Sequence, residues 1–164
     1  MRLIRTIITL ALLIVLQISL VDLIAIRGFK PDLLLLYILF RLPGKGVIFP
    51  VLAGFGIGLL QDLVGGGFLG VYAFSKSVVG FFLSKFFPEK APAEKLLHFI
   101  AIAFCVLVHD TISQYIYLQD GYSGFFKLFF NQILPSAGYN FFTFLLLMLL
   151  PFKRKSMIKD GMAL

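Results

Sequence analysis

Three ionisable side chains lie inside otherwise apolar stretches of the chain, where they could form buried ion pairs or line a solute pocket. They are Asp62, Lys76 and Asp110. A charge at mid-bilayer costs roughly 2.5–3.5 kcal/mol, so each of them needs a partner or a wet cavity. Lys76 and Asp110 each lie ~12 Å below the predicted outer end of their helix, and we therefore expect them to form an ion pair. Asp62 lies nearer to the outer surface and could share the lysine, whose long stem can reach upward.

Further polar side chains fall in the same outer half of the predicted spans, whereas the inner halves are almost purely apolar. We call this group the polar cluster; it comprises Gln17, Gln61, Lys76, His109, Asp110 and Gln114. It could be a hydrogen-bonded network that fixes the helices in register, or a pocket for a solute from outside. We favour the network, because hydrogen-bonded groups need no ligand to be satisfied.

The sequence offers no arrangement typical of an enzyme, a cofactor site or a metal site. No serine, cysteine or carboxylate pair stands with a base at a catalytic spacing. Gly65–Gly70 matches the dinucleotide-binding pattern G-x-G-x-x-G, but a membrane helix precedes it instead of the strand that the pattern requires. His98 and His109 lie about 16 Å apart along one helix and cannot share a metal ion. We therefore predict no catalysis and no cofactor.

Glycines mark one face of the helix that contains Asp62. Gly54, Gly58 and Asp62 are four residues apart and so share a face, and small residues let two membrane helices approach closely. A tight turn follows, and its glycines are Gly65, Gly66, Gly67 and Gly70. We expect this face and the turn to serve helix packing, either within the chain or with a partner protein.

The composition of the chain is that of a membrane protein. Hydrophobic residues make up 60% of the 164 residues and charged residues only 14%, against typical shares of roughly 45–50% and 25%. The mean hydropathy is +0.98. The net charge of +7 does not indicate nucleic-acid binding, because the basic residues form short clusters between apolar stretches and no continuous basic face. We predict one integral membrane domain over residues 1–152 and a basic cytoplasmic tail over residues 153–164.

The hydropathy pattern predicts an all-α, polytopic membrane protein with six transmembrane helices. A span needs roughly 20 apolar residues, with about 17 tolerated. Five stretches approach this length: Ile4–Ile24, Val47–Val64, Phe68–Phe87, Leu96–Leu118 and Ser136–Pro151. The sixth, Leu33–Phe40, comes second in the chain and would cover about half a bilayer, so it is either a short span or a re-entrant helix. Gly124–Leu134 is interpreted as a short interfacial helix, or as part of a last helix kinked at Pro135.

The distribution of basic residues favours six spans with both termini in the cytoplasm. In that arrangement eleven of the fifteen Lys and Arg residues lie on the cytoplasmic side, as the positive-inside rule requires. Without the second span, Arg41 and Lys45 would move outside, and the two terminal basic clusters would lie on opposite sides. Arg2 and Arg5 precede an apolar run that no signal-peptidase site follows, so we expect an uncleaved first span.

The order of these features resembles the MreD family of rod shape-determining proteins. The diagnostic part is a G-x-x-x-G-L-x-x-D run that leads into a glycine turn and a Leu-Gly pair, here Gly54, Gly58, Leu59, Asp62, Leu69 and Gly70. The basic start, the segment PDLLLLYILF at Pro31–Phe40 and the basic tail also fit the pattern. The resemblance therefore covers nearly the whole chain.

The resemblance implies a non-catalytic component of the bacterial cell-elongation machinery in the cytoplasmic (inner) membrane. MreD-like proteins are associated with MreC, with the MreB filament, and with the glycosyltransferase and transpeptidase that build lateral peptidoglycan. Their fold is similar to that of the six-helix substrate-binding subunits of energy-coupling-factor vitamin transporters. The alternative is therefore such a transporter subunit, with the surroundings of Lys76, His109 and Asp110 as its solute pocket.

Overall fold

The computed structural model describes residues 2–19, 21–66, 68–88, 95–118, 121 and 124–149. The regular elements in these ranges are all helices, apart from one isolated bridge between Ile26 and Phe29. In chain order they are α1 (Arg2–Ser19), η1 (Val21–Ile24), α2 (Leu33–Arg41), α3 (Ile48–Gly65), α4 (Val71–Phe86), α5 (Lys95–Leu118), α6 (Phe125–Leu128), η3 (Phe129–Ile133) and α7 (Leu134–Leu149). The all-α prediction is confirmed. The predicted tail over residues 153–164 and Gly67 lie outside the described residues.

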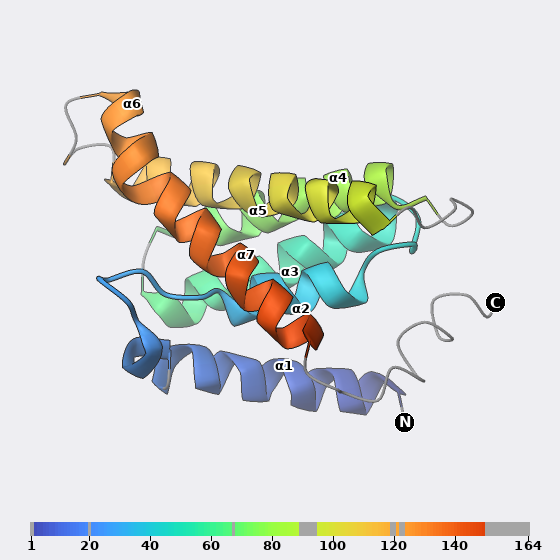
Figure 1. Ribbon diagram of the computed structural model, residues 1–164. Helices are drawn as coiled ribbons and strands as arrows, with labels where there is room; N and C mark the ends of the chain where they lie inside the picture. Colours follow the sequence, from blue (N-terminus) through green and yellow to red (C-terminus); the bar gives the residue numbers. More distant parts are fainter. Residues whose placement is uncertain are drawn as a thin grey trace.

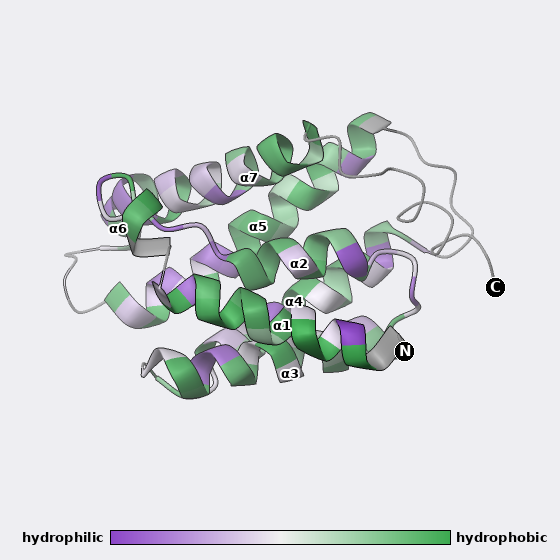
Figure 2. Ribbon diagram, turned by 90° about the horizontal axis from the view of Figure 1, so that it is seen from below, coloured by the Kyte–Doolittle hydropathy of each residue, from purple (hydrophilic) through white to green (hydrophobic). Residues whose placement is uncertain are grey.

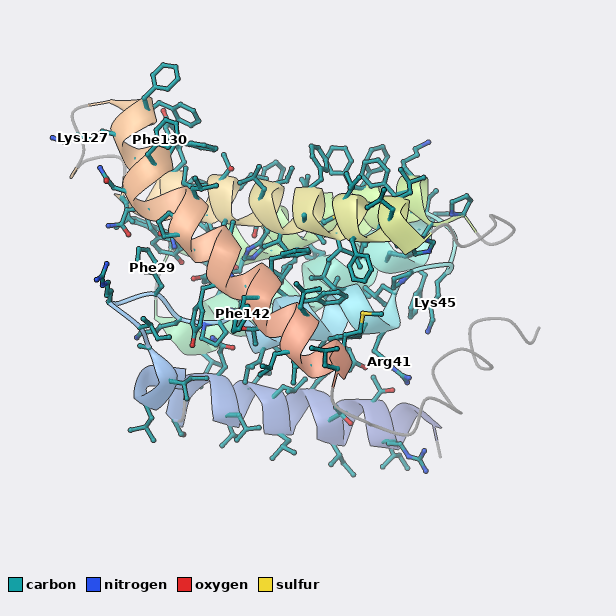
Figure 3. The ribbon with its side chains drawn as sticks, in the orientation of Figure 1. Phe29, Arg41, Lys45, Lys127, Phe130 and Phe142 are labelled. Atoms are coloured by element: carbon teal, nitrogen blue, oxygen red, sulfur yellow. The ribbon has the colours of Figure 1, made fainter. Side chains whose placement is uncertain are left out.

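The helices run back and forth between the two ends of one bundle (Figure 1). α1 begins at one end, which also holds Arg41 and Lys45 (Figure 3); we call it the Arg41 end. The opposite end holds η1, the turn between α3 and α4, and α6 with Lys127; we call it the Lys127 end. α7 starts beyond α6 at the Lys127 end and crosses the other helices toward the Arg41 end.

The short helix α2 forms the centre of the hydrophobic core. It contacts α1, α3 and α4, and its buried side chains are Leu34, Leu35, Leu36, Ile38 and Leu39. Asp32 caps its N-terminus by accepting a hydrogen bond from the Leu35 N–H at 2.8 Å. The 9 residues of α2 cover only ~14 Å, as the sequence predicted, and longer helices surround them.

Helices α3 and α4 form an antiparallel hairpin with close backbone contact along its length. Three glycines make this contact possible, because a Cβ at Gly54, Gly58 or Gly80 would come within 3.0 Å of backbone atoms of the opposite helix. The opposing residues are Lys76 for Gly54, Tyr72 and Ala73 for Gly58, and Pro50 for Gly80. These pairs fix the register of the hairpin.

The last helix begins earlier than the predicted span. α6, η3 and α7 follow one another without interruption from Phe125 to Leu149, so the interpretation as one helix through Pro135 is correct and a separate interfacial helix is not present. η3 is a π-helical turn, in which the Leu134 N–H bonds to the Phe129 carbonyl five residues back. The ring of Pro135 would clash with a carbonyl four residues back in a regular helix, and the wider turn accommodates it.

The outer surface of the bundle is that of an integral membrane protein. Three described helices are long and apolar enough to cross a membrane, Ile48–Gly65, Leu96–Leu118 and Phe125–Leu149, and α1 contains a shorter apolar helix. Large hydrophobic side chains such as Ile8 and Leu52 are exposed on the outer faces, and hydrophobic residues follow most of the length of the helices (Figure 2). So large an exposed apolar surface is unfavourable in water and favourable in contact with lipid chains.

Candidate functional site

Lys76, in α4, is fully buried and pairs with a residue that the sequence analysis did not choose. Its Nζ donates to Asp32 Oδ2 at 2.5 Å and lies 4.6 Å from the centre of the Tyr72 ring. The expected ion pair between Lys76 and Asp110 is therefore wrong. The reason is that α2 packs against α4 and brings its N-cap carboxylate directly to the lysine.

Asp32 connects four helices. Its carboxylate accepts the Leu35 N–H of α2, the Lys76 ammonium of α4 and, at 3.3 Å, Nε2 of Gln61 in α3. Its backbone N–H donates to Asn140 Oδ1 of α7 at 2.7 Å. These partners replace the water that a carboxylate loses on burial. Hydrogen bonds to an ionised carboxylate are stronger than hydrogen bonds between neutral groups.

His109 and Asp110 extend this network through α5. Since Lys76 Nζ can only donate, His109 Nε2 accepts from it at 3.2 Å. The proton of the imidazole then sits on Nδ1, which donates to Asp110 Oδ1 at 3.0 Å. Asn140 Nδ2 donates to the other oxygen of Asp110, also at 3.0 Å. His109 thus stands between the lysine and the acid that we expected to meet directly.

Asp62 caps α4 instead of sharing the buried lysine. Its carboxylate accepts the backbone N–H groups of Gly70, Tyr72 and Ala73, each at 3.0 Å. A negative charge is favourable there, because the first N–H groups of a helix have no partner within it. Gly66 and Gly70 have φ angles of 67° and 101°, which favour glycine, so the turn that returns the chain to Asp62 depends on them.

The glutamines of the polar cluster lie on α1, α3 and α5. Gln17 ties α1 to the start of α2, where its Oε1 accepts the Leu33 N–H at 2.8 Å and its Nε2 donates to the Pro31 carbonyl at 3.2 Å. Gln114 Nε2 donates to Ser136 Oγ of α7 at 3.4 Å. With Gln61 on α3, the structure brings the polar residues of α1, α2, α3, α4, α5 and α7 together.

The predicted glycine face packs within the chain. α4 covers Gly54 and Gly58, so a partner could reach these residues only by displacing α4. Gly65, at the end of α3, has open space beside it, which leaves the turn as the accessible part of the predicted surface.

Three residues of this arrangement were missed by the sequence analysis. Asp32 follows a proline and precedes an apolar run, and so was interpreted only as a helix start. Asn140 is a polar residue inside the last apolar stretch, and a polar residue in such a stretch was the signal that identified Gln17. Gly80 opposes Pro50 across the hairpin, and only the register of the two helices makes that visible.

A cavity of about 460 Å³ borders the network near the Lys127 end. Helices α1 to α5 all contribute to its walls, and so do Gln17, Gln61 and Gln114. Lys76 and His109 are not among its lining residues. The polar cluster therefore divides into a closed charged network and a cavity lined by amides.

The charged network holds helices together and presents no open reactive group. Among the described residues, Gln61 Oε1 is the only fully buried side-chain nitrogen or oxygen without a hydrogen-bond partner. No group of three or more His, Cys, Asp and Glu side chains in the described ranges is placed to hold a metal ion. The arrangement is suited to fixing helices in register, which is the first of the two interpretations of the polar cluster.

Comparison with known protein families identifies this chain's relatives. The family model described as rod shape-determining protein MreD matches residues 1–156 of the chain. This range includes every helix described above. No curated protein and no solved structure matches the chain.

Proposed function

The chain belongs to the MreD family of rod shape-determining proteins, and on this premise we propose that it is a non-catalytic scaffold of the bacterial cell-elongation machinery. The family is part of the machinery that determines rod shape. The observation that carries the proposal is the match over residues 1–156, which covers the complete helical bundle. We place the protein in the cytoplasmic membrane as a multi-pass protein with six spans and both termini inside.

The proposed partners are an MreC-like membrane protein, the MreB filament, and the glycosyltransferase and transpeptidase of lateral peptidoglycan synthesis. The bundle supports docking through its outer surface, because its polar groups face inward and its glycine face is covered by α4. Exposed apolar side chains on three helices offer the contact area for a partner's transmembrane helix: Leu52 of α3, Phe74 of α4 and Phe142 of α7. The basic loop with Arg41 and Lys45 would face the cytoplasmic partners.

The vitamin-transporter alternative is the weaker proposal. The family match favours the scaffold, and the charged residues that would have formed the solute pocket, Lys76, His109 and Asp110, bond to one another and to α2 and α7. Among the described residues, the amide-lined cavity is a feature that fits ligand binding.

Photo-crosslinking tests the scaffold proposal. A photoreactive amino acid is placed at Leu52, Phe74 or Phe142, one per variant, in cells that also produce an MreC-like protein. We expect one of these faces to crosslink to that protein, and the unmodified chain to co-purify with it. Leu35, buried in α2, is the matched control and should not crosslink. Absence of both co-purification and crosslinking at all three faces would refute the docking role.

A further inference from the structure

The cavity at the Lys127 end has two kinds of wall, one hydrogen-bonding and one apolar. We propose that it binds an amphiphile with an uncharged, hydroxyl- or amide-bearing head group and an apolar chain. A volume of about 460 Å³ lies within the range of roughly 300–1,000 Å³ that is usual for ligand sites. This binding goes beyond the scaffold role and does not depend on it.

The polar wall is built from neutral amide and hydroxyl groups, some of whose atoms already bond within the chain. They are the amides of Gln17, Gln61 and Gln114 and the hydroxyls of Ser113, Tyr72 and Tyr117. The charged residues that reach the cavity are Asp62 and Lys30. The carboxylate of Asp62 is already bound by three backbone N–H groups. Lys30 is exposed and is a single cation against six neutral polar side chains. Such a wall recognises hydroxyl or amide groups better than it recognises a phosphate or a carboxylate.

Gln61 supplies a second, independent observation. This side chain is only 9% exposed; its Nε2 is used by Asp32, and its Oε1 has no hydrogen-bond partner within the described part of the chain. A buried acceptor without a donor is costly, by about 1–3 kcal/mol. Gln61 lines the cavity, and a rotation of its side chain would present this oxygen to a hydroxyl or N–H group of a ligand there.

The apolar wall lies on the side of α1. Ile14 and Ile18 of α1 line the cavity together with Leu34 and Val64, while Val15, next to them on α1, is 57% exposed on the outer surface. α1 is therefore a thin wall between the cavity and the bilayer. The chain of an amphiphile would lie along these aliphatic side chains, with its head group toward Gln61.

The test uses the full-length protein in phosphatidylcholine nanodiscs and a diazirine-bearing 1-O-octylglycerol as the probe. We expect crosslinks in the peptides that contain Ile14 to Ile18 and Val64. Unlabelled octyl glucoside should lower them about tenfold, whereas octyl phosphate and chain-free glycerol should not. The proposal is overturned if octyl phosphate competes as well as octyl glucoside, or if labelling spreads over the outer surface and nothing competes.

A matched pair of variants on α1 locates the site. Ile14→Phe fills the cavity and should abolish the competed crosslink, whereas Val15→Phe faces lipid and should retain it. Ile18→Phe serves as a second blocking variant if Ile14→Phe does not elute as a single folded species, and the competition in the unchanged protein needs no variant. Unchanged crosslinking in a folded Ile14→Phe or Ile18→Phe would refute the site.

The same head-group chemistry could come from the membrane or from solution, and mass spectrometry separates these sources. The protein is extracted with its surrounding lipids, without detergent, and the bound lipids are identified. A neutral hydroxyl-bearing lipid that is retained in Val15→Phe and lost in Ile14→Phe supports a membrane source. Octyl glucoside binding without such a lipid supports a soluble amphiphile.

Discussion

Lys76 and Asp32 depend on each other, because each is almost completely removed from solvent. If one is removed, the other remains as a buried charge without its counter-ion. Breaking a buried pair in this way costs ~3–5 kcal/mol, whereas replacing both partners can be nearly neutral. The second contact of the lysine, to His109 Nε2, supplies no negative charge and cannot replace the carboxylate.

We therefore expect Lys76→Met to lower the free energy of unfolding by about 3–5 kcal/mol, and the addition of Asp32→Asn to restore much of it. Asn at position 32 can still cap α2. The measurement is equilibrium unfolding in mixed micelles.

The control for this prediction is Lys76→Met combined with Asp110→Asn, the pairing that sequence depth alone suggested. Asp110 is bound by His109 and Asn140, so this double variant should be no more stable than Lys76→Met. Restoration by Asp110→Asn, and none by Asp32→Asn, would show that the ion pair is misassigned.

At the scale of the elements, the α3–α4 hairpin depends on the absence of side chains at its contact points. Gly58 meets the backbone of Tyr72 and Ala73, whereas Gly56 on the same helix has open space beside it. Asp62 then fastens the start of α4 through three N–H groups. The glycines of α3 therefore allow α4 to approach closely, and Asp62 of the same helix caps the start of α4, so both features stabilise the same hairpin.

Gly58→Ala should destabilise the protein by about 1–3 kcal/mol, because the added methyl group overpacks the helix contact. Gly56→Ala is the matched control; it should be neutral or stabilising by about 0.5–1 kcal/mol, since alanine favours a helix over glycine. Thermal unfolding of the purified variants measures both. Equal effects of the two substitutions would rule out close packing at Gly58.

At the scale of the whole molecule, the polar network explains how so short a helix as α2 can lie inside the bundle. Non-helical backbone at membrane depth is tolerated only where protein satisfies its polar groups. The chain before α2 meets this condition, because Gln17 binds the Pro31 carbonyl and the Leu33 N–H, and Asn140 binds the Asp32 N–H. The network therefore supports a chain that passes from the Lys127 end to the Arg41 end along α2.

Cysteine labelling tests whether α2 carries the chain from one side of the membrane to the other. Cys105 is the only cysteine of the chain and is fully buried. We therefore expect little background labelling when a single cysteine is introduced at an exposed position. With a membrane-impermeant maleimide on intact cells, we expect Lys127→Cys to be labelled and both Arg5→Cys and Lys45→Cys to be protected. Protection of Arg5→Cys together with labelling of Lys45→Cys would mean that α2 does not cross the membrane.

The sequence by itself determined that the protein is helical and apolar, and it determined its family. Hydropathy is a property summed along the chain, so the apolar stretches, the short helix at Leu33–Phe40 and the glycine turn could be found without knowing any contact. The start of the last helix could not be found in this way, because a proline such as Pro135 permits either a helix end or a π-helical turn.

Only the tertiary structure decided which polar groups meet. Depth along a helix is readable from the sequence, and it placed Lys76 and Asp110 at the same level. The rotation of each helix about its axis and the choice of its neighbours are not readable in this way, because they result from packing between the helices. α2 lies next to α4, and for this reason Asp32, which the sequence marked only as a cap, holds the lysine.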